Sequence, residues 1–204
     1  MAPKVPYKND YEAWFATDPS DLWVFDKLIL SRICGYSCGP RGARVPRPDK
    51  YIVRPISNFE GMGQGAHIQF LEYETMDLPH GFFWSEIFIG PHLSVDYTDG
   101  EPVLTVSGTH DKERPLQRFS YWVKIPNTIP LPDFLVDISR RYRFINCEFI
   151  GGKLIEVHLR HNPDFSHGNT EMIPVWPGES TVTPYGFRYI PDTDEEDRVG
   201  IFVN

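Results

Sequence analysis

The chain has 204 residues, of which 41% are hydrophobic and 14% aromatic, and its formal net charge is −8. This composition is typical of a globular protein with a substantial core and excludes a disordered chain. No run approaches the roughly 18 apolar residues of a membrane-spanning helix, and the N-terminus lacks a signal-peptide core. We therefore expect a cytoplasmic protein without membrane contact, and the acidic charge makes nucleic acid an unlikely partner on composition alone.

The three cysteines, Cys34, Cys38 and Cys147, are scattered along the sequence. The first two form a C-x3-C pair, but no second pair exists to complete a zinc site. We expect three thiols without a disulfide or a metal.

The first expected elements are a short helical turn at residues 11–16 and a helix at residues 21–33. Asp18 and Pro19 supply a capping side chain and a fixed φ before this helix, and Gly35 ends it. Lys27 lies in the middle of the expected helix, where a solvated surface lysine is the default interpretation. Residues 35–50 are rich in glycine, proline and arginine and predict a basic loop.

A strand at residues 51–56 carries Arg54 and leads into a loop with glycines at alternate positions, Gly61, Gly63 and Gly65. Glycines let a backbone approach a ligand closely and point N–H groups at an anion, and arginine pairs well with phosphate oxygens. The loop alone also fits a flexible hairpin tip.

The pattern then predicts a strand at residues 67–73 and a buried strand at residues 82–89 that carries a single carboxylate, Glu86. Buried carboxylates are rare unless paired, so Glu86 indicates a partner. A hairpin with an Asp99-Gly100 turn is expected at residues 92–107, and a second helix at residues 131–143. The basic residues at 112–124 are interpreted as solvated charge, and further strands are expected at 173–176 and 200–203.

The most informative segment is a second hairpin, in which Gly151-Gly152 separates apolar runs at residues 144–150 and 153–159. Glu148 precedes the turn, and Glu156, His158 and Arg160 follow it at alternate positions, so they share one face. Two carboxylates on one face suit Mg²⁺. The same spacing also fits the solvated face of an amphipathic hairpin.

Between Asp26 and Arg160 these features follow one another in an order that resembles the ATP-grasp superfamily. The matching segments there are a DK-type helix, a vvKP-type strand, a glycine-rich flap, an E-f-i-x-G hinge and a terminal E…E-x-N-x-R strand pair. The resemblance implies an α+β fold with two small lobes of mostly antiparallel sheet, a few helices and a nucleotide site between the lobes. It also implies a single ATP-grasp-like domain over residues 1–204: an arm, helix and basic loop at about 1–55, a nucleotide-binding lobe at 51–107, and a metal-binding lobe with a C-terminal extension at 108–204.

The resemblance further implies ATP and Mg²⁺ as cofactors and assigns roles to residues. The implied nucleotide-binding residues are Lys27, Arg54, Gly61, Gly63, Gly65, Glu86, Phe88 and Ile89. The implied metal ligands are Glu148, Glu156 and His158, and the implied catalytic residues are Arg160 and Arg54. Arg54 stands where the family usually has lysine, and His158 where it has asparagine.

Members of the family activate a carboxylate as an acyl phosphate, which an amine or similar nucleophile then attacks. The resemblance thus implies an ATP-dependent carboxylate–amine or carboxylate–thiol ligase. Imidazole is a softer ligand than an amide oxygen, so Mn²⁺ is expected to serve beside Mg²⁺. Only about 20 residues precede the first long helix, so we expect a second protomer or a partner protein to replace the family's usual N-terminal domain. This compact form is similar to short ATP-grasp-like proteins of tailed phages, which implies the host cytoplasm.

Two alternatives stay open at this point. One is a catalytically degenerate nucleotide-binding or interaction protein that keeps the fold. The other is a cupin-like or sugar-binding β-barrel, suggested by the short strands and the seven histidines. The barrel requires His67, His92 or His158 beside a carboxylate on inward-facing positions, and the two expected helices count against it.

Overall fold

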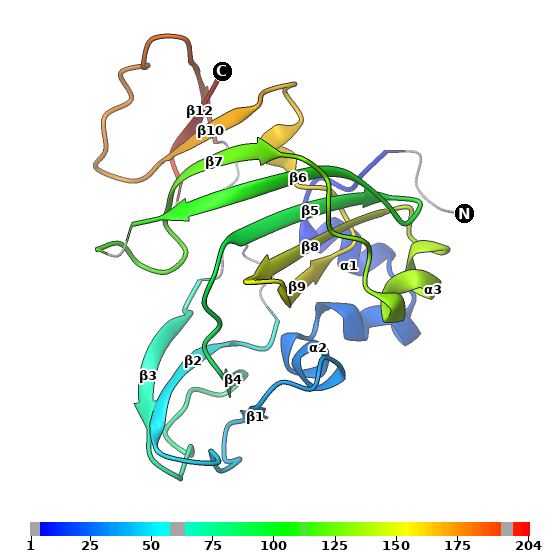
Figure 1. Cartoon of the computed structure of the whole chain (residues 1–204), viewed down its shortest axis with the longest axis vertical. Helices are drawn as coiled ribbons and strands as arrows, with labels where there is room; N and C mark the ends of the chain where they lie inside the picture. The colour runs from blue at the N-terminus through cyan, green and yellow to red at the C-terminus, as the bar shows by residue number, and fades with distance from the viewer. Residues whose placement is uncertain (1–4, 58–63, 112, 193–197) are drawn as a thin grey trace.

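The computed structural model describes residues 5–57, 64–111, 113–192 and 198–204. Within these residues the chain forms two antiparallel sheets and a few short helices, which confirms the expected α+β class (Figure 1). The small sheet has the strand order β1-β4-β2-β3, and the large sheet β11-β12-β10-β7-β6-β5-β8-β9. No helix in the described part of the chain is long and apolar enough to cross a membrane.

The strands of the small sheet are β1 (Cys38–Pro40), β2 (Asp49–Pro55), β3 (His67–Leu71) and β4 (Phe82–Ser85). Those of the large sheet are β5 (His92–Thr98), β6 (Glu101–His110), β7 (Phe119–Ile125), β8 (Phe144–Ile150), β9 (Lys153–His158), β10 (Glu171–Val175), β11 (Arg188–Pro191) and β12 (Gly200–Val203). The helical segments are α1 (Asp10–Ala16), η1 (Pro19–Phe25), α2 (Lys27–Ile33), η2 (Asp133–Leu135), α3 (Val136–Ser139) and η3 (Pro163–Phe165).

The expected helix at residues 21–33 is in fact two elements, η1 and α2, which meet at Asp26. Asp26 has an extended backbone, and its side chain accepts a hydrogen bond from the Ile29 N–H at 2.8 Å. A new helix therefore begins at Lys27, which is not in the middle of a helix as the sequence pattern predicted. Gly35, with φ +73°, follows the end of α2 as expected.

Three further elements are shorter than predicted, among them the strand expected at residues 67–73, which ends at Leu71, and three strands were not predicted. The second helix covers residues 133–139 as η2 and α3, and the strand at residues 82–89 ends at Ser85. Strand β1 lies in the segment interpreted as a basic loop, β7 overlaps the segment interpreted as solvated charge, and β11 lies in a segment where no element was predicted. The change of sheet lies between β4 and β5, so the proposed boundary at 107/108 falls inside β6 and not at the junction of the sheets.

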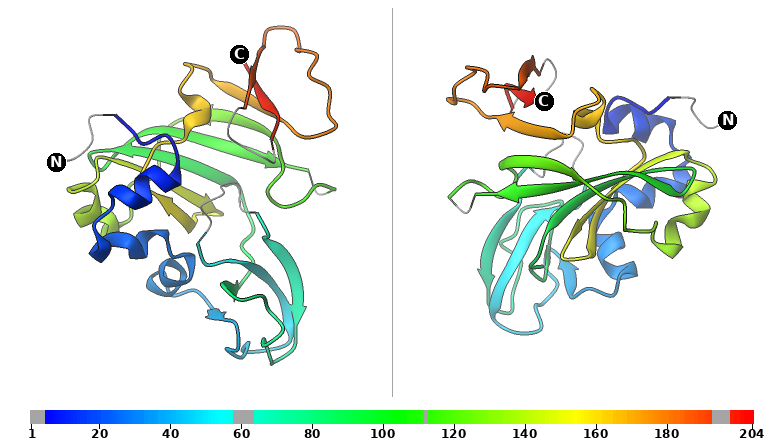
Figure 2. Two further views of the ribbon diagram at one scale, coloured as in Figure 1. Left: turned by 180° about the vertical axis from the view of Figure 1, so that it is seen from behind. Right: turned by 45° about the horizontal axis from the view of Figure 1, so that its top comes forward.

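The large sheet has two apolar clusters and the small sheet has one; the second cluster of the large sheet consists of Val106, Trp122, Phe165, Met172, Ile201 and Val203. In the large sheet, Val95, Cys147 and Val157 pack against Ala13 of α1 and Leu30 of α2. The helices thus cover the sheet beside β8 and β9, as both views of Figure 2 show. The small sheet encloses a separate cluster of Val45, Tyr51, Val53, Leu71, Leu78 and Trp84. All three cysteines are free thiols, as expected.

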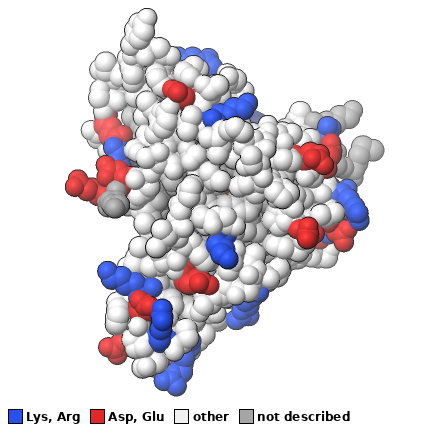
Figure 3. All heavy atoms as spheres, viewed as in Figure 1, with Lys and Arg blue, Asp and Glu red and all other residues white. Residues whose placement is uncertain are grey.

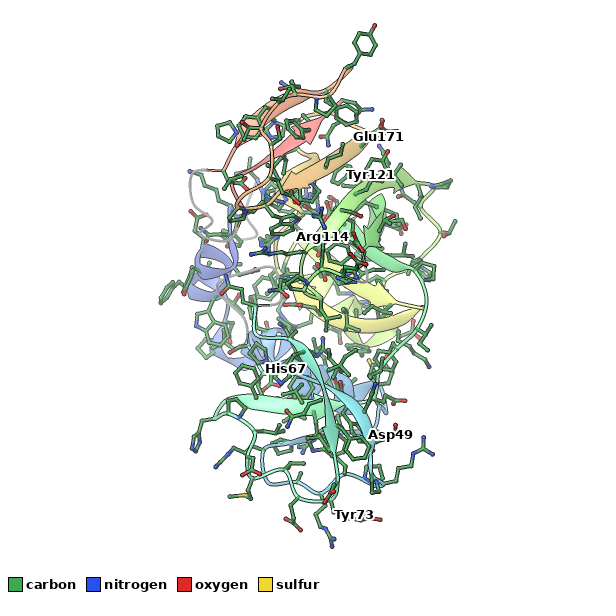
Figure 4. All side chains as sticks on the ribbon, turned by 90° about the vertical axis from the view of Figure 1, so that its left-hand side faces the viewer. Asp49, His67, Tyr73, Arg114, Tyr121 and Glu171 are labelled. Carbon is green, nitrogen blue, oxygen red and sulfur yellow. The ribbon has the colours of Figure 1, made fainter. Side chains whose placement is uncertain are left out.

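The C-terminal strands extend the large sheet beyond β7, as Figure 4 shows around Tyr121 and Glu171. Arg114 forms an ion pair with Glu179 at 2.8 Å, and Arg118 lies over the Trp176 ring at 5.6 Å. Part of the basic cluster at 112–124 is therefore engaged by the C-terminal segment and is not simply solvated; Lys112 lies outside the described residues.

Candidate nucleotide and metal site

The Gly-Gly hairpin forms as predicted from β8 and β9. Gly151 and Gly152 both have positive φ, +57° and +78°, as a tight two-residue turn requires. Glu148 pairs with Glu156 across the hairpin, and the neighbouring pair is Asn146 with His158. Cross-strand partners lie on one face of a sheet, so the two carboxylates and the imidazole face the same side.

The Glu156 carboxylate is paired with Lys27. Lys27 Nζ lies 3.0 Å from Glu156 Oε1, and Lys27 is only 2% exposed. Asp26 caps α2, so Lys27 is the first residue of this helix. Because α2 packs against the edge strand β9, the side chain of Lys27 lies next to that strand. The default interpretation of Lys27 as a solvated surface lysine is therefore wrong.

The Glu148 carboxylate accepts a hydrogen bond from His92 of β5, whose Nε2 lies 3.1 Å from Oε2. The His92 ring is held edge-on by Phe119 and Trp122, with centroid distances of 4.8 and 5.6 Å. Burial raises the pKa of Glu148, but the hydrogen bond and charge of His92, together with the charges of His158 and Lys27, lower it to about 2. Glu148 is thus held as a carboxylate.

This shift predicts a loss of stability in acid. The pKa of Glu148 in the folded state, about 2, lies below its ordinary value of 4.5, so its contribution is present above pH 4.5 and is lost as the pH falls toward 2. We expect the free energy of unfolding to fall by on the order of 3 kcal/mol through this group over that range. Chemical denaturation at a series of pH values measures this, and the His92→Phe variant, which keeps the aromatic packing, should show a smaller decline.

Arg54 reaches the hairpin from the small sheet. Its Nη1 donates to the carbonyl of Ile155 on β9 at 3.1 Å, and its guanidinium lies over the Phe83 ring at 5.1 Å. Burial lowers the pKa of Arg54, while the charges of Glu156 and Glu148 oppose that effect. Its Nε is buried and has no hydrogen-bond partner among the described residues. An orphaned cationic N–H beside two carboxylates fits an anionic ligand such as a phosphate.

His158 and Arg160 are both held by Asp10 of α1. Asp10 Oδ1 accepts from His158 Nδ1 at 2.9 Å and from Arg160 Nε at 3.0 Å, and Oδ2 accepts from Arg160 Nη2 at 2.8 Å. Burial raises the pKa of Asp10, but the charges and hydrogen bonds of His158 and Arg160 outweigh it and keep this pKa well below its usual range. The sequence pattern did not indicate Asp10, which is 150 residues away from Arg160.

The segment expected as the hinge lies between the sheets. Glu86 has a partner, as expected: Oε1 accepts from the Ser37 N–H at 2.9 Å, and the Glu86 N–H donates to the Ser37 carbonyl at 2.9 Å. Phe88 packs edge-on against Tyr36 at 4.7 Å. Ile89 is 92% exposed, so its side chain does not pack with Phe88 and Tyr36.

The glycine loop is described only at its end. Gly61 and Gly63 lie outside the described residues, and Gly65, with φ +80°, precedes β3. Figure 4 shows His67, the first residue of β3, near the junction of the small sheet with the large one. In Figure 3 the outline of the molecule is indented on the left between its upper and lower parts.

Metal binding by the hairpin side chains requires oxygens from a ligand. Within the described ranges, no group of three or more His, Cys, Asp or Glu side chains is arranged to hold a metal. His158 Nε2 lies 3.7 Å from Glu156 Oε1, while its Nδ1 is engaged by Asp10. Mg²⁺ is usually held by one or two carboxylates together with substrate phosphates, which is the arrangement that Glu148 and Glu156 allow.

Comparison with solved structures identifies the fold. The L-amino acid ligase from Bacillus licheniformis is 9% identical with a TM-score of 0.51, over 89% of this chain and 66% of that chain. An ATP-grasp superfamily protein from Archaeoglobus fulgidus is 15% identical with a TM-score of 0.49, over 89% and 64% of the two chains. The ATP-grasp ligase PsnB, complexed with a phosphomimetic precursor variant, Mg and ADP, is 15% identical with a TM-score of 0.40, over 72% and 52%. No protein-family model and no curated protein sequence matches the chain.

The chain has an ATP-grasp-like fold, as the order of its motifs predicted. It spans less than two thirds of the length of each of these three proteins. The β-barrel alternative is wrong, because the strands form two separate open sheets, and His67 lies on the small sheet while His92 and His158 lie on the large one.

Proposed function

We propose that this chain binds Mg·ATP beside the β8–β9 hairpin and acts as an ATP-dependent ligase on a carboxylate substrate. The convergence of two buried cations from separate elements on a pair of carboxylates supports this proposal. Lys27, at the start of α2, forms an ion pair with Glu156, and Arg54 of β2 donates to the carbonyl of the adjacent Ile155, where the charges of Glu156 and Glu148 raise its pKa against the effect of burial. Packing alone does not require such a cluster, because burying charges costs several kcal/mol per ion unless they are well paired.

Each residue then has a role that its position allows. Lys27 and Arg54 would neutralise phosphate oxygens, and the orphaned Nε–H of Arg54 would gain an acceptor. Glu148 and Glu156, with His158 beside them, would hold Mg²⁺ or Mn²⁺ together with those oxygens. Bound Mg·ATP supplies the phosphoryl group that activates the carboxylate, and the protein contributes charge and position.

The remaining roles concern the nucleotide base and the acceptor. Phe88, packed on Tyr36, would lie against the adenine, with Glu86 fixing the hinge backbone. Glycines of the 61–65 loop would cover the phosphates, and Arg160 would add positive charge near the transferring group. We also propose that a second protomer or a partner protein completes the site for the nucleophile, an amine or a thiol.

A second candidate, nucleotide binding without ligation, is favoured by one observation. Asp10 already engages the Nε and Nη2 groups of Arg160, and Glu156 is already paired with Lys27. Incubating the protein with Mg·ATP, amino acids and short peptides and measuring ADP or phosphate release separates the two candidates, because only a ligase forms product.

Mg·ATP binding can be tested by thermal shift. Ligand at about a thousand times its Kd stabilises the folded state by roughly 4 kcal/mol, which corresponds to a rise of several degrees in Tm. We expect this rise with ATP and Mg²⁺ or Mn²⁺, little with GTP, and none with EDTA. Glu148→Gln should abolish it, whereas Glu101→Gln, an exposed carboxylate on β6, should not. A wild-type protein whose Tm no nucleotide raises would refute the proposal.

A further inference from the structure

We propose that Asp10 is a positioning residue of this site: its carboxylate holds Arg160 and His158 in the orientation in which they face Glu148 and Glu156. The inference rests on the proposed Mg·ATP site and adds the N-terminal segment to it. Asp10 is the first residue of α1 and is 4% exposed, so it is not part of a detached polar arm.

The contact between Asp10 and Arg160 is bidentate. Both carboxylate oxygens are engaged, at 3.0 Å from Nε and 2.8 Å from Nη2, and this fork geometry fixes the plane of the guanidinium. Nη1 is tied to the His161 carbonyl at 3.1 Å. The described residues thus engage three N–H groups of Arg160 and leave the rest for the oxygens of a ligand.

The same carboxylate also sets the direction of His158. Asp10 engages Nδ1, so the other ring nitrogen, Nε2, is the one that faces Glu156, at 3.7 Å from Oε1. A carboxylate that accepts a hydrogen bond from one ring nitrogen of a histidine commonly orients the other ring nitrogen toward a metal. Asp10 therefore fixes the direction of both side chains.

Charge balance explains why a carboxylate is needed at this position. Asp10, Glu148 and Glu156 are the anions that raise the pKa of Arg160 against the effect of its burial. Without Asp10, the buried cation would depend on the two carboxylates of the hairpin. With Asp10 in place, Arg160 has its own counterion, and the nearest partners of Glu148 and Glu156 are His92 and Lys27.

The test is a double-mutant cycle on Mg·ATP affinity, measured by isothermal titration calorimetry. We expect Asp10→Asn to raise the Kd about 10- to 100-fold, the range usual for groups that orient site ligands. In an Arg160→Gln/His158→Gln background the same substitution should have no further effect, because nothing remains to be positioned. Glu12→Gln, at an exposed carboxylate on the same helix, is the control and should leave the Kd unchanged.

Several outcomes would overturn the inference. An equal rise in Kd in both backgrounds would mean that Asp10 acts only through the stability of the fold. Tighter binding by Asp10→Asn would mean that Asp10 competes with the ligand. If the wild type itself does not bind Mg·ATP, the proposed function fails, and the inference is judged separately by NMR of the His158 ring in the nucleotide-free protein. The hydrogen-bonded Nδ1–H signal should be present in the wild type and lost in Asp10→Ala; its persistence would refute the orienting role.

Discussion

Replacement of Glu156 by alanine is expected to have the largest effect of any single substitution in this site. It removes the partner of Lys27, whose ammonium lies 3.0 Å away and is almost fully buried. Breaking a buried ion pair from one side costs about 3–5 kcal/mol, because the remaining charge is left unpaired. The variant should also lose all stabilisation by Mg·ATP. Urea denaturation, with and without Mg·ATP, measures both effects.

A double variant separates stability from ligand binding. Lys27→Met/Glu156→Met replaces the ion pair by two apolar side chains of similar length, which is often neutral or stabilising in a buried setting. We expect it to recover most of the lost unfolding free energy but none of the response to Mg·ATP. Recovery of nucleotide binding in this double variant would contradict the role proposed for the pair.

The second large effect is expected at the hairpin turn, where Gly151 packs against the hinge. A Cβ at Gly151 would collide with the carbonyl oxygen of Ile89, and one at Gly90 would come within 2.5 Å of the Gly151 Cα. The Gly151 N–H donates to the Pro91 carbonyl at 3.0 Å. We expect Gly151→Ala to cost about 1–2 kcal/mol for its positive φ and about 1–3 kcal/mol more for the displaced backbone. Denaturant titration gives the total.

Gly152→Ala is the matched control for this prediction. Gly152 has a similar φ of +78°, but an added Cβ would meet nothing within 4 Å. The Gly152→Ala variant should therefore lose only the unfolding free energy that a positive φ costs an alanine, about 1–2 kcal/mol. The difference between the two alanine variants measures the contact between turn and hinge, and equal losses would show that this contact carries no strain.

The parts of the site that were predictable depend on local patterns. A Gly-Gly turn marks the hairpin and sets its first pairs, Ile150 with Lys153 and Phe149 with Leu154. A register shift between Phe149 and Glu148 then brings Glu148 opposite Glu156, and the pattern did not indicate this shift. The order of motifs along the chain was sufficient to indicate the ATP-grasp-like fold, which the structural comparison confirms.

The rest depends on contacts between distant segments. Whether Lys27 is buried is decided by the Asp26 cap, which ends one helical segment and turns the next toward β9. The sequence pattern shows only an unbroken apolar stripe there, so it predicted one helix and a solvated lysine. Asp10 carries no local signal, because its partners follow about 150 residues later.

The pairing of Ser37 with Glu86 has a mechanical consequence. The chain runs into the small sheet at one of these residues and out of it at the other, and two hydrogen bonds of 2.9 Å hold them side by side. The small sheet therefore leaves and rejoins the rest of the chain at this pair and has its own apolar cluster. It is also held by the Lys27 N–H, which donates to the Ile56 carbonyl at 2.9 Å, and by Arg54, which donates to the Ile155 carbonyl at 3.1 Å. A rotation of the small sheet about the pair of Ser37 and Glu86 would have to break the hydrogen bond from Arg54 to Ile155, so these contacts together hold Arg54 beside the hairpin carboxylates.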